Sequence, residues 1–325
     1  MAALMTEPRP FVHDPVLVGL VVELLATVPA GTVVDATLGG AGHAAAVLQS
    51  RPDLRVLGLD RDRSALAAAQ ARLAPFGDRA EAHHARFDQL ATVVAAAGAA
   101  SQPIVGVLFD LGVSSPQFDD ADRGFSYRHE APLDMRMDRS TGPSAAEVVN
   151  GLGEHDLAAL LRRNADERFA ARIARAIVAA RPIVTTTELT AVVVDAIPAP
   201  ARRRGGHPAK RTFQAIRIHV NGELDVLPPA LDAAIDVLAP GGRLLAISYH
   251  SGEDRIVKER LRRAEDGGCT CPPGLPCACG AVPEARLLKR GGWTPTPEEI
   301  EQNPRAASAR LRAAERLTPS PKDQP

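Results

Sequence analysis

Short apolar runs alternate with alanine-rich segments over the first third of the chain. The apolar runs predict strands over Val33–Thr37, Arg55–Asp60, Ala80–Ala85 and Val105–Leu111. The segments between them predict helices over His43–Gln49, Asp62–Leu73 and Phe87–Ala97. This alternation is typical of a parallel sheet covered by helices on both faces. We therefore expect an α/β, Rossmann-like fold with a mostly parallel sheet.

The same pattern returns late in the chain. A predicted helix over Pro229–Leu238 and a turn over Pro240–Gly242 precede a fifth predicted strand, Arg243–Ser248. The tail from Gly291 is rich in Pro, Glu and Arg, and we expect its last residues to be frayed.

The middle of the chain has a helical pattern instead. Ser144–Glu147 forms a capping box, and Ala165–Ala180 places Phe169, Ile173, Ile177 and Ala180 on one helical face. Thr187 is expected to cap a helix that ends before Pro198, and His207–Pro208 to begin another. Loops are expected at Gly112–Ser140 and Arg202–Gly206. These patterns predict an all-α substrate-recognition domain (118–217) inserted into a discontinuous domain (1–117 and 218–325).

Composition narrows the class of protein. The 325 residues carry a net charge of −1, so attraction to a polyanion requires a local basic patch. The first residues, MAALMTEPRP, lack the features of a signal peptide, and no apolar run reaches the roughly 18 residues of a membrane span. Four cysteines in a chain of this size do not indicate a secreted disulfide scaffold. We expect a cytoplasmic protein without a membrane partner.

Four polar features follow the ends of predicted strands, where open parallel sheets bind ligands. The first is the segment Gly39-Gly40-Ala41-Gly42 in VVDATLGGAGHAAAV, called the glycine corner below. The others are Asp60, Asp110 in FDLGVSSPQ, and Ser248, Tyr249 and His250 in SYHSGED. An acid about 20 residues beyond a glycine corner can accept hydrogen bonds from ribose hydroxyls. Nucleotide-like ligands are therefore expected here.

Two classes of ligand share this arrangement. A dinucleotide needs its pyrophosphate on a helix N-terminus, usually through GxGxxG. Here the spacing is DxTxGGxG, and Asp35 precedes the glycines. A carboxylate would repel a pyrophosphate but suits the ammonium of a methionine moiety. The residues favour S-adenosylmethionine, although the glycines could simply form a tight turn.

Two further motifs stand apart from the sheet. The stretch ARRRGGHPAKRTFQAIR supplies Arg202, Arg203, Arg204, Lys210, Arg211 and Arg217. It predicts contact with RNA phosphates, although a run of charges is often only a solvated face. The motif CTCPPGLPCACG holds Cys269, Cys271, Cys277 and Cys279, which could bind zinc or form a reduced loop. Structural zinc more often uses CxxC than CxC pairs.

Longer motifs carry a family resemblance. HDPVLVGLVVELL, VDATLGGAGHA, LGLDRD, FDLGVSSPQFDDADRGFSYRHEAPLDMRMD, HPAKRTFQAIRIHVNGEL, APGGRLLAISYHSGEDRIVK and NPRAASARLRAAER occur in this order from about His13 to Leu317. The chain resembles the bacterial 16S ribosomal RNA (cytosine-N4)-methyltransferases of the MraW type. The resemblance implies a class I S-adenosylmethionine-dependent enzyme that methylates the N4 amine of a cytidine in the decoding region. It implies that the partner is 16S ribosomal RNA within the small subunit. It does not imply a bound metal. It leaves the oligomeric state open, and a homodimer is one alternative.

The resemblance also implies cofactor-binding residues, namely Ala41, Gly42, His43, Asp60, Phe87, Asp110 and Gln117. One position departs from the family pattern, because Ala41 stands where glycine is usual. An alanine disfavours positive φ. We expect the corner to adjust rather than lose the cofactor, since a backbone N–H would still serve there.

For catalysis we expect Asp110 to lie near the target amine and accept hydrogen bonds from it. His250 is a second candidate, although a lone histidine is more often structural. Phe125, Tyr127, Arg128 and Arg136 predict a lid that stacks on the base, or else an ordered linker. The competing functions are a DNA or small-molecule amino-methyltransferase of the same fold, an NAD-dependent dehydrogenase and a non-enzymatic ribosome-assembly factor.

Overall fold

A mostly parallel sheet forms the centre of the molecule. The computed structural model describes residues 15–97, 102–113, 120–203, 206–272 and 277–318, and within them a seven-stranded sheet has the order β3-β2-β1-β4-β5-β7-β6. The strands are β1 (Gly31–Asp35), β2 (Leu54–Asp60), β3 (Ala80–His84), β4 (Ile104–Asp110), β5 (Leu238–Ser248), β6 (Ala285–Leu287) and β7 (Arg310–Arg316). Strands β1 to β5 pair in parallel, and β7 runs antiparallel to β5 and β6. The predicted fold class is confirmed.

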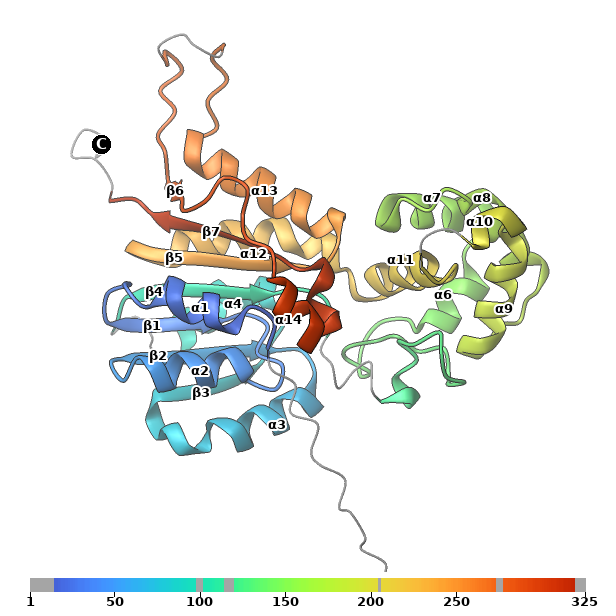
Figure 1. Cartoon of the computed structure of the whole chain (residues 1–325), viewed down its shortest axis with the longest axis horizontal. Helices are drawn as coiled ribbons and strands as arrows, with labels where there is room; N and C mark the ends of the chain where they lie inside the picture. The colour runs from blue at the N-terminus through green and yellow to red at the C-terminus, as the bar shows by residue number, and fades with distance from the viewer. Residues whose placement is uncertain (1–14, 98–101, 114–119, 204–205, 273–276, 319–325) are drawn as a thin grey trace, which may run out of the picture.

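Helices cover both faces of this sheet (Figure 1). Successive side chains of a strand point to opposite faces, so Val33 packs into one hydrophobic cluster and Val34 into the other. The first cluster holds side chains from α1 (Val18–Leu25), α2 (Gly42–Ser50) and α3 (Arg63–Leu73). The second holds side chains from α4 (Leu90–Ala96), α12 (Glu223–Val237) and α13 (Ser251–Asp266). The central strands β1 and β4 are thereby buried on both sides, whereas β3 at the edge has no buried residue.

The strand order reverses between β1 and β4. From β1 the chain builds outward through β2 and β3 on one side, and β4 and β5 lie on the other. Loops leaving such a switch point diverge, and ligands bind in the crevice between them. The carboxyl ends of β1 and β4, at Asp35 and Asp110, therefore mark the expected binding crevice.

A separate helical part lies beside this edge of the sheet (Figure 1). Its helices are α6 (Ala145–Gly151), α7 (Glu154–Ala165), α8 (Ala170–Ala179), α9 (Thr186–Ala196), α10 (Ala199–Arg202) and α11 (Lys210–Asn221). A third hydrophobic cluster, from Phe125 to Ile216, forms its core. Helix α11 passes the predicted boundary at residue 217 and ends at Asn221, whose side-chain amide contacts the backbone of Met135 and Met137. The division into two domains stays a prediction.

Several predicted element boundaries in the helical part were wrong. The helix predicted over 165–180 begins at Ala170, because Asp166 adopts a left-handed conformation (φ 48°) and ends α7. Ala180 is exposed rather than on the buried face. Thr185, not Thr187, caps α9, through a reciprocal capping box with Glu188. The capping box at Ser144–Glu147 is confirmed.

Boundaries also shift in the sheet part. A 3-10 turn occupies Phe87–Gln89 ahead of α4, and α12 begins at Glu223, six positions before the predicted start. Strand β5 includes the predicted turn at Pro240–Gly242. The sequence predicts no strand after Ser248, yet β7 pairs antiparallel with β5 on one side and with β6 on the other. In the described part of the chain, we find no helix that is both long and apolar enough to span a membrane.

Candidate active site

A cavity of about 2520 Å³ lies where the sheet edge faces the helical part. Its walls include the corner after β1, the ends of β2, β4 and β5, and residues of α7 and α11. Of the predicted site residues, the cavity is lined by Gly42, His43, Asp60, Phe87, Asp110, Lys210, Arg211 and His250. Two other predicted residues, Gln117 and Arg204, lie outside the described residues.

The glycine corner is fastened to the neighbouring strand. The N–H of Gly39 donates to Oδ2 of Asp60 at 2.7 Å, and the N–H of Leu38 donates to the carbonyl of Leu59 at 2.8 Å. The second carboxylate oxygen of Asp60 accepts the N–H of Asp62 at 2.7 Å. Each oxygen has two lone-pair sites, so the carboxylate can still accept from a ligand. Burial raises the pKa of Asp60, against the hydrogen bonds from Asp62 and Gly39.

Ala41 occupies the strained conformation that glycine would adopt freely. Its φ of 59° and ψ of 31° are left-handed, and it directly precedes α2. The side chain is fully buried and does not line the cavity, and the N–H donates to the carbonyl of Leu38 at 2.8 Å. The backbone donor that we expected for the cofactor is thus already used within the corner.

A cluster of polar side chains surrounds the carboxylate of Asp110. Oδ1 accepts the hydroxyl of Tyr249 at 2.7 Å, and Oδ2 lies 3.7 Å from Nδ1 of His43. The other nitrogen of His43 lies 2.9 Å from the carbonyl of Val16. Burial raises the pKa of Asp110, and the nearby His43 and the hydrogen bond from Tyr249 counteract part of that increase. The Asp110 carboxylate is therefore held in place at the cavity wall.

Asp35 is buried beneath this cluster rather than at the cavity. Its carboxylate accepts the N–H of Thr37 at 3.2 Å, and it is absent from the described residues that line the cavity. Burial raises its pKa from 3.8 to about 7, partly offset by His43. Asp35 is only 3% exposed, so the contact with a ligand ammonium that the sequence suggested stays a prediction.

The raised pKa of Asp35 predicts a pH-dependent stability. Between about pH 4 and 7 the folded protein keeps a proton that the unfolded chain has lost, so stability falls as pH rises. We expect Asp35→Asn to remove this decrease, which amounts to as much as about 4 kcal/mol. Thermal unfolding at pH 4 and pH 8 measures it, with the exposed Asp156→Asn as control. An identical pH dependence in wild type and Asp35→Asn would contradict this assignment.

Comparisons with known proteins decide the family. The profile described as the MraW methylase family matches residues 10–317. The chain belongs to this methylase family. A protein of Frankia alni is 53% identical over 317 residues, covering 95% of this chain and 96% of that protein. Proteins of Symbiobacterium thermophilum and Thermobifida fusca are each 51% identical, covering 94% of this chain and 97% and 93% of theirs. All three are named ribosomal RNA small subunit methyltransferase H.

The mostly parallel α/β sheet is the framework of this methylase, and the cofactor is S-adenosylmethionine. The residues at the strand ends fit this group chemically. Asp60 offers a carboxylate for ribose hydroxyls, and the half-buried ring of Phe87 offers an apolar surface for adenine. Phe87 is itself oriented by an edge-to-face contact with Phe109, with ring centroids 5.8 Å apart.

His250 lies at the cavity but caps a helix. Its Nδ1 accepts the N–H groups of Gly252 and Glu253 at the start of α13. The carboxylate of Glu253 in turn accepts the N–H of Tyr249 at 2.9 Å. Burial alone would raise the pKa of Glu253, but His250 and Arg217 outweigh it and lower that pKa. This geometry gives His250 a positioning role, and a direct part in the chemistry stays a prediction.

Some side chains of the basic stretch 201–217 line the cavity, and others form hydrogen bonds or ion pairs within the protein. Lys210 and Arg211 are exposed and line the cavity, whereas Arg202 donates to the carbonyls of Ile197 and Asp195. Arg203 is exposed but outside the cavity wall. We expected Arg217 to contact RNA phosphates. Instead its guanidinium forms two hydrogen bonds with the carboxylate of Glu223, at 2.8 and 2.9 Å, and is engaged within the protein.

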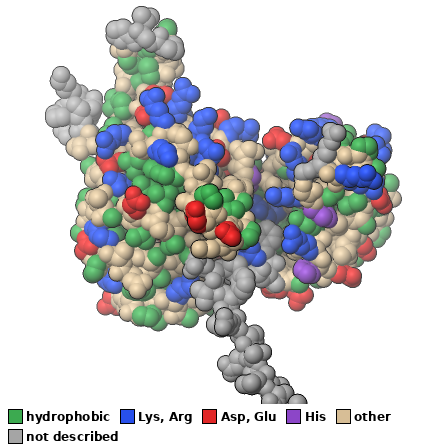
Figure 2. All heavy atoms as spheres, viewed as in Figure 1, with side chains coloured by type: hydrophobic (Ala, Val, Ile, Leu, Met, Phe, Trp, Pro, Cys, Tyr) green, Lys and Arg blue, Asp and Glu red, His purple; other side chains and the backbone are tan. Residues whose placement is uncertain are grey.

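Three further cations outside the basic stretch complete this wall, and of these only Arg128, in the predicted lid, was singled out from the sequence. Arg163 and Arg168 are exposed and line the same cavity as Lys210, and Arg128 lines it from the segment before α6. Figure 2 shows Lys and Arg side chains on this side of the helical part. They come from separate elements, so no run of basic residues in the sequence could reveal them. The face defined by Arg128, Arg163, Arg168, Lys210 and Arg211 is called the basic wall below.

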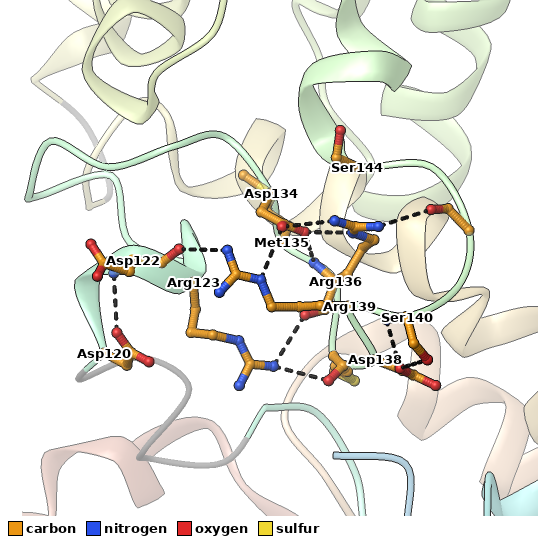
Figure 3. A network of polar contacts seen from close by, with 12 residues as sticks. Asp120, Asp122, Arg123, Asp134, Met135, Arg136, Asp138, Arg139, Ser140 and Ser144 are labelled. Carbon is orange, nitrogen blue, oxygen red and sulfur yellow. Dashed lines mark hydrogen bonds and ion pairs between the residues drawn. The ribbon is translucent and has the colours of Figure 1, made fainter. Parts of the chain in front are cut away.

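The predicted lid segment is fastened by polar contacts (Figure 3). Arg123 donates to the carbonyls of Arg136 and Met137 and pairs with Asp62 of the sheet part at 2.9 Å. Arg136 forms a two-pronged pair with Asp134. Phe125 packs in the helical core and is only 5% exposed where it reaches the cavity wall, so it offers little of its ring to a base. The structure favours an ordered linker for this segment.

Tyr127 lies at the cavity wall together with Phe125 and Arg128, and its ring is only partly buried. Its ring stacks on His207 with centroids 4.3 Å apart and an angle of 13° between the planes. Phe213 meets the same ring edge-on at 5.8 Å. Tyr127 belongs to the predicted lid, but His207, its stacking partner, is 80 positions away in the chain and only the fold brings the two rings together.

Proposed function

We propose that this methylase transfers the methyl group of S-adenosylmethionine to the N4 amine of a cytidine in the decoding region of 16S ribosomal RNA, in the cytoplasm. The names of the relatives support small-subunit ribosomal RNA as the substrate class. The position of Asp110 carries the proposal for an amine acceptor. Its carboxylate lies at the cavity wall, oriented by Tyr249, at the switch point of the sheet.

The chemistry of cytosine explains why a carboxylate is needed there. The lone pair of the N4 amine is delocalised into the ring, so the amine is a weak nucleophile. A carboxylate that accepts an N–H of this amine orients it and stabilises the positive charge that develops on nitrogen. S-adenosylmethionine supplies an electrophilic methyl group when bound. Because Oδ1 of Asp110 accepts from Tyr249, Oδ2 is the atom that we assign to the amine.

The same oxygen can take the proton that the reaction releases. Nitrogen gains a bond to carbon and must then lose one proton to become neutral again. Burial raises the pKa of Asp110, which makes its carboxylate a better proton acceptor than an exposed aspartate. His43, 3.7 Å from Oδ2, limits that increase and keeps the carboxylate available in its ionised form.

The cavity has room for an extruded nucleotide. A duplex would bury the N4 amine in base pairing, so the cytidine must be unpaired or turned out of its helix. The cavity of about 2520 Å³ is larger than the pockets that hold only a small ligand. Tyr127 offers an aromatic ring at its wall, and bases commonly stack on such rings.

The basic wall accounts for RNA binding in a chain of nearly zero net charge. We expect Arg168→Ala/Lys210→Ala to weaken RNA binding and to flatten its salt dependence, lowering the log–log slope by about 1.4. The double variant Arg172→Ala/Arg175→Ala on α8, outside the cavity, removes the same charge as a control. Affinity measured at several salt concentrations compares the two, and equal slopes would rule out the basic wall.

Transfer of labelled methyl groups tests the proposed function. Small ribosomal subunits, free 16S ribosomal RNA, DNA and free cytidine are offered as separate acceptors, followed by nucleoside analysis. Label in N4-methylcytidine from ribosomal RNA or subunits is expected. Label at another base or atom would refute the N4 assignment, and labelling of DNA or cytidine alone would favour the competing amino-methyltransferase.

A further inference from the structure

A long hairpin leaves the sheet part at the end of α13 (Figure 1). Gly267 ends that helix in a left-handed conformation, and a Cβ at this position would lie 2.4 Å from the carbonyl oxygen of Val282. The N–H of Glu284 donates to the carbonyl of Ala264 at 2.7 Å. The outgoing and returning arms are therefore fastened together where the hairpin begins.

Beyond the residues where the two arms are joined, the described part of the hairpin lacks the hydrophobic packing and strand pairing that usually stabilise a fold. Among the described hairpin residues, 267–272 and 277–284, none is buried and none belongs to a strand. A small projection without a hydrophobic core usually requires a disulfide or a metal to hold its shape. The hairpin contains all four cysteines of the chain.

The four thiols converge from both arms. Sγ of Cys269 lies 3.5 Å from Sγ of Cys277 and 3.7 Å from that of Cys279, and the last two are 3.5 Å apart. With Cys271 included, all four sulfur atoms lie within 4.8 Å of one another. These separations exceed a disulfide bond of about 2.05 Å. Four sulfurs at about 2.3 Å from a tetrahedral zinc ion would be about 3.8 Å apart.

The four sulfur ligands indicate which metal ion the cluster would bind. Four thiolates in a tetrahedral arrangement suit zinc or iron, whereas calcium and magnesium prefer oxygen ligands. An iron–sulfur cluster would hold its cysteines farther apart, because several metal ions would lie between them. Zinc needs no redox partner. The N–H of Ala278 also donates to Sγ of Cys271 at 3.3 Å, a contact that stabilises a thiolate.

We propose that Cys269, Cys271, Cys277 and Cys279 bind one structural Zn²⁺ ion that joins the two arms of the hairpin. Each thiol that ligates the ion gives up its proton, so loading the metal releases protons to solvent. The four ligands occupy all positions of a tetrahedral ion, which excludes a role in activating water. The metal stabilises the hairpin where side-chain packing does not.

This site is independent of methyl transfer. No described residue of the hairpin lines the cavity that holds Asp60 and Asp110. Loss of the ion should therefore leave S-adenosylmethionine affinity unchanged. That separation lets the metal be tested without relying on activity.

Metal analysis of protein purified without chelator, from cells supplied with zinc, tests the proposal. We expect about one equivalent of zinc per chain, and less than a tenth in Cys269→Ser/Cys277→Ser. The control Thr270→Ser changes the same hairpin without removing a thiol and should keep its zinc. Removal of the ion should also make the hairpin more sensitive to protease, with protection restored by added Zn²⁺.

Thiol titration of unfolded protein distinguishes the other states of the cluster. Four reactive thiols in the wild type together with less than a tenth of an equivalent of zinc would overturn the proposal in favour of a reduced loop. Fewer than four thiols without zinc would overturn it in favour of disulfides. One equivalent of iron in place of zinc would also refute it.

Discussion

Asp110→Asn is expected to lower the rate of methyl transfer about 10²- to 10⁴-fold, while cofactor affinity and thermal stability change little. The amide has the shape of the carboxylate, and its oxygen can still accept the hydroxyl of Tyr249. It cannot supply a negative charge to the amine or accept its proton, and such contributions have this size. Single-turnover transfer to RNA and calorimetric binding of S-adenosylmethionine separate the two effects.

Tyr249→Phe provides the matched comparison for this prediction. It removes the hydroxyl that holds Oδ1 of Asp110 and keeps the carboxylate charge. Acting through Asp110, it should reduce the rate less than Asp110→Asn does. Unchanged turnover in Asp110→Asn would exclude this residue from the chemistry, whereas an equal loss in both cofactor binding and rate would assign it to the binding site alone.

Asp60→Asn is expected to weaken S-adenosylmethionine binding about 100-fold. Both carboxylate oxygens accept backbone N–H groups, from Gly39 and Asp62. An amide would turn its NH₂ group toward one of these donors, and the variant would also lose charge-assisted hydrogen bonds to a ribose, each worth about 1.5–3 kcal/mol. The dissociation constant measured by calorimetry gives the size of the loss.

Glu81→Gln on the neighbouring strand β3 is the control for Asp60→Asn. It makes the same carboxylate-to-amide change at an exposed position that does not line the cavity. Its affinity should equal that of the wild type. Wild-type affinity in Asp60→Asn would remove Asp60 from the cofactor site and reduce its role to fastening the glycine corner.

Local patterns were sufficient for the parallel strands and for the polar residues at their ends. Alternating apolar segments of fixed length have few ways to be buried, so β1 to β5 could be predicted in order. Strand β7 could not, because the charges of RLRAAER are compensated by segments far away in the chain. Arg243, for example, pairs with Glu315 at 3.0 Å.

In the candidate site, too, some features could be predicted from local sequence and others depend on tertiary contacts. Asp60 ends β2 and Asp110 ends β4, the two parallel strands on either side of β1, so the sequence placed both at one edge of the sheet. Tyr249 approaches Asp110 because β5 pairs with β4 in a register that sets Ile247 opposite Asp110. Register depends on contacts between segments that are far apart in the chain, and no local pattern records it.

The sequence by itself determined the α/β class, the family resemblance, the acids at the strand ends and the grouping of four cysteines. Only the tertiary structure decided that Asp35 and Ala41 are buried, that Arg217 pairs with Glu223, and that Arg163 and Arg168 join Lys210 on the basic wall. The physical reason is that residue type and spacing fix local conformation. Burial, ion pairing and charge density are properties of surfaces that come together only when distant segments pack.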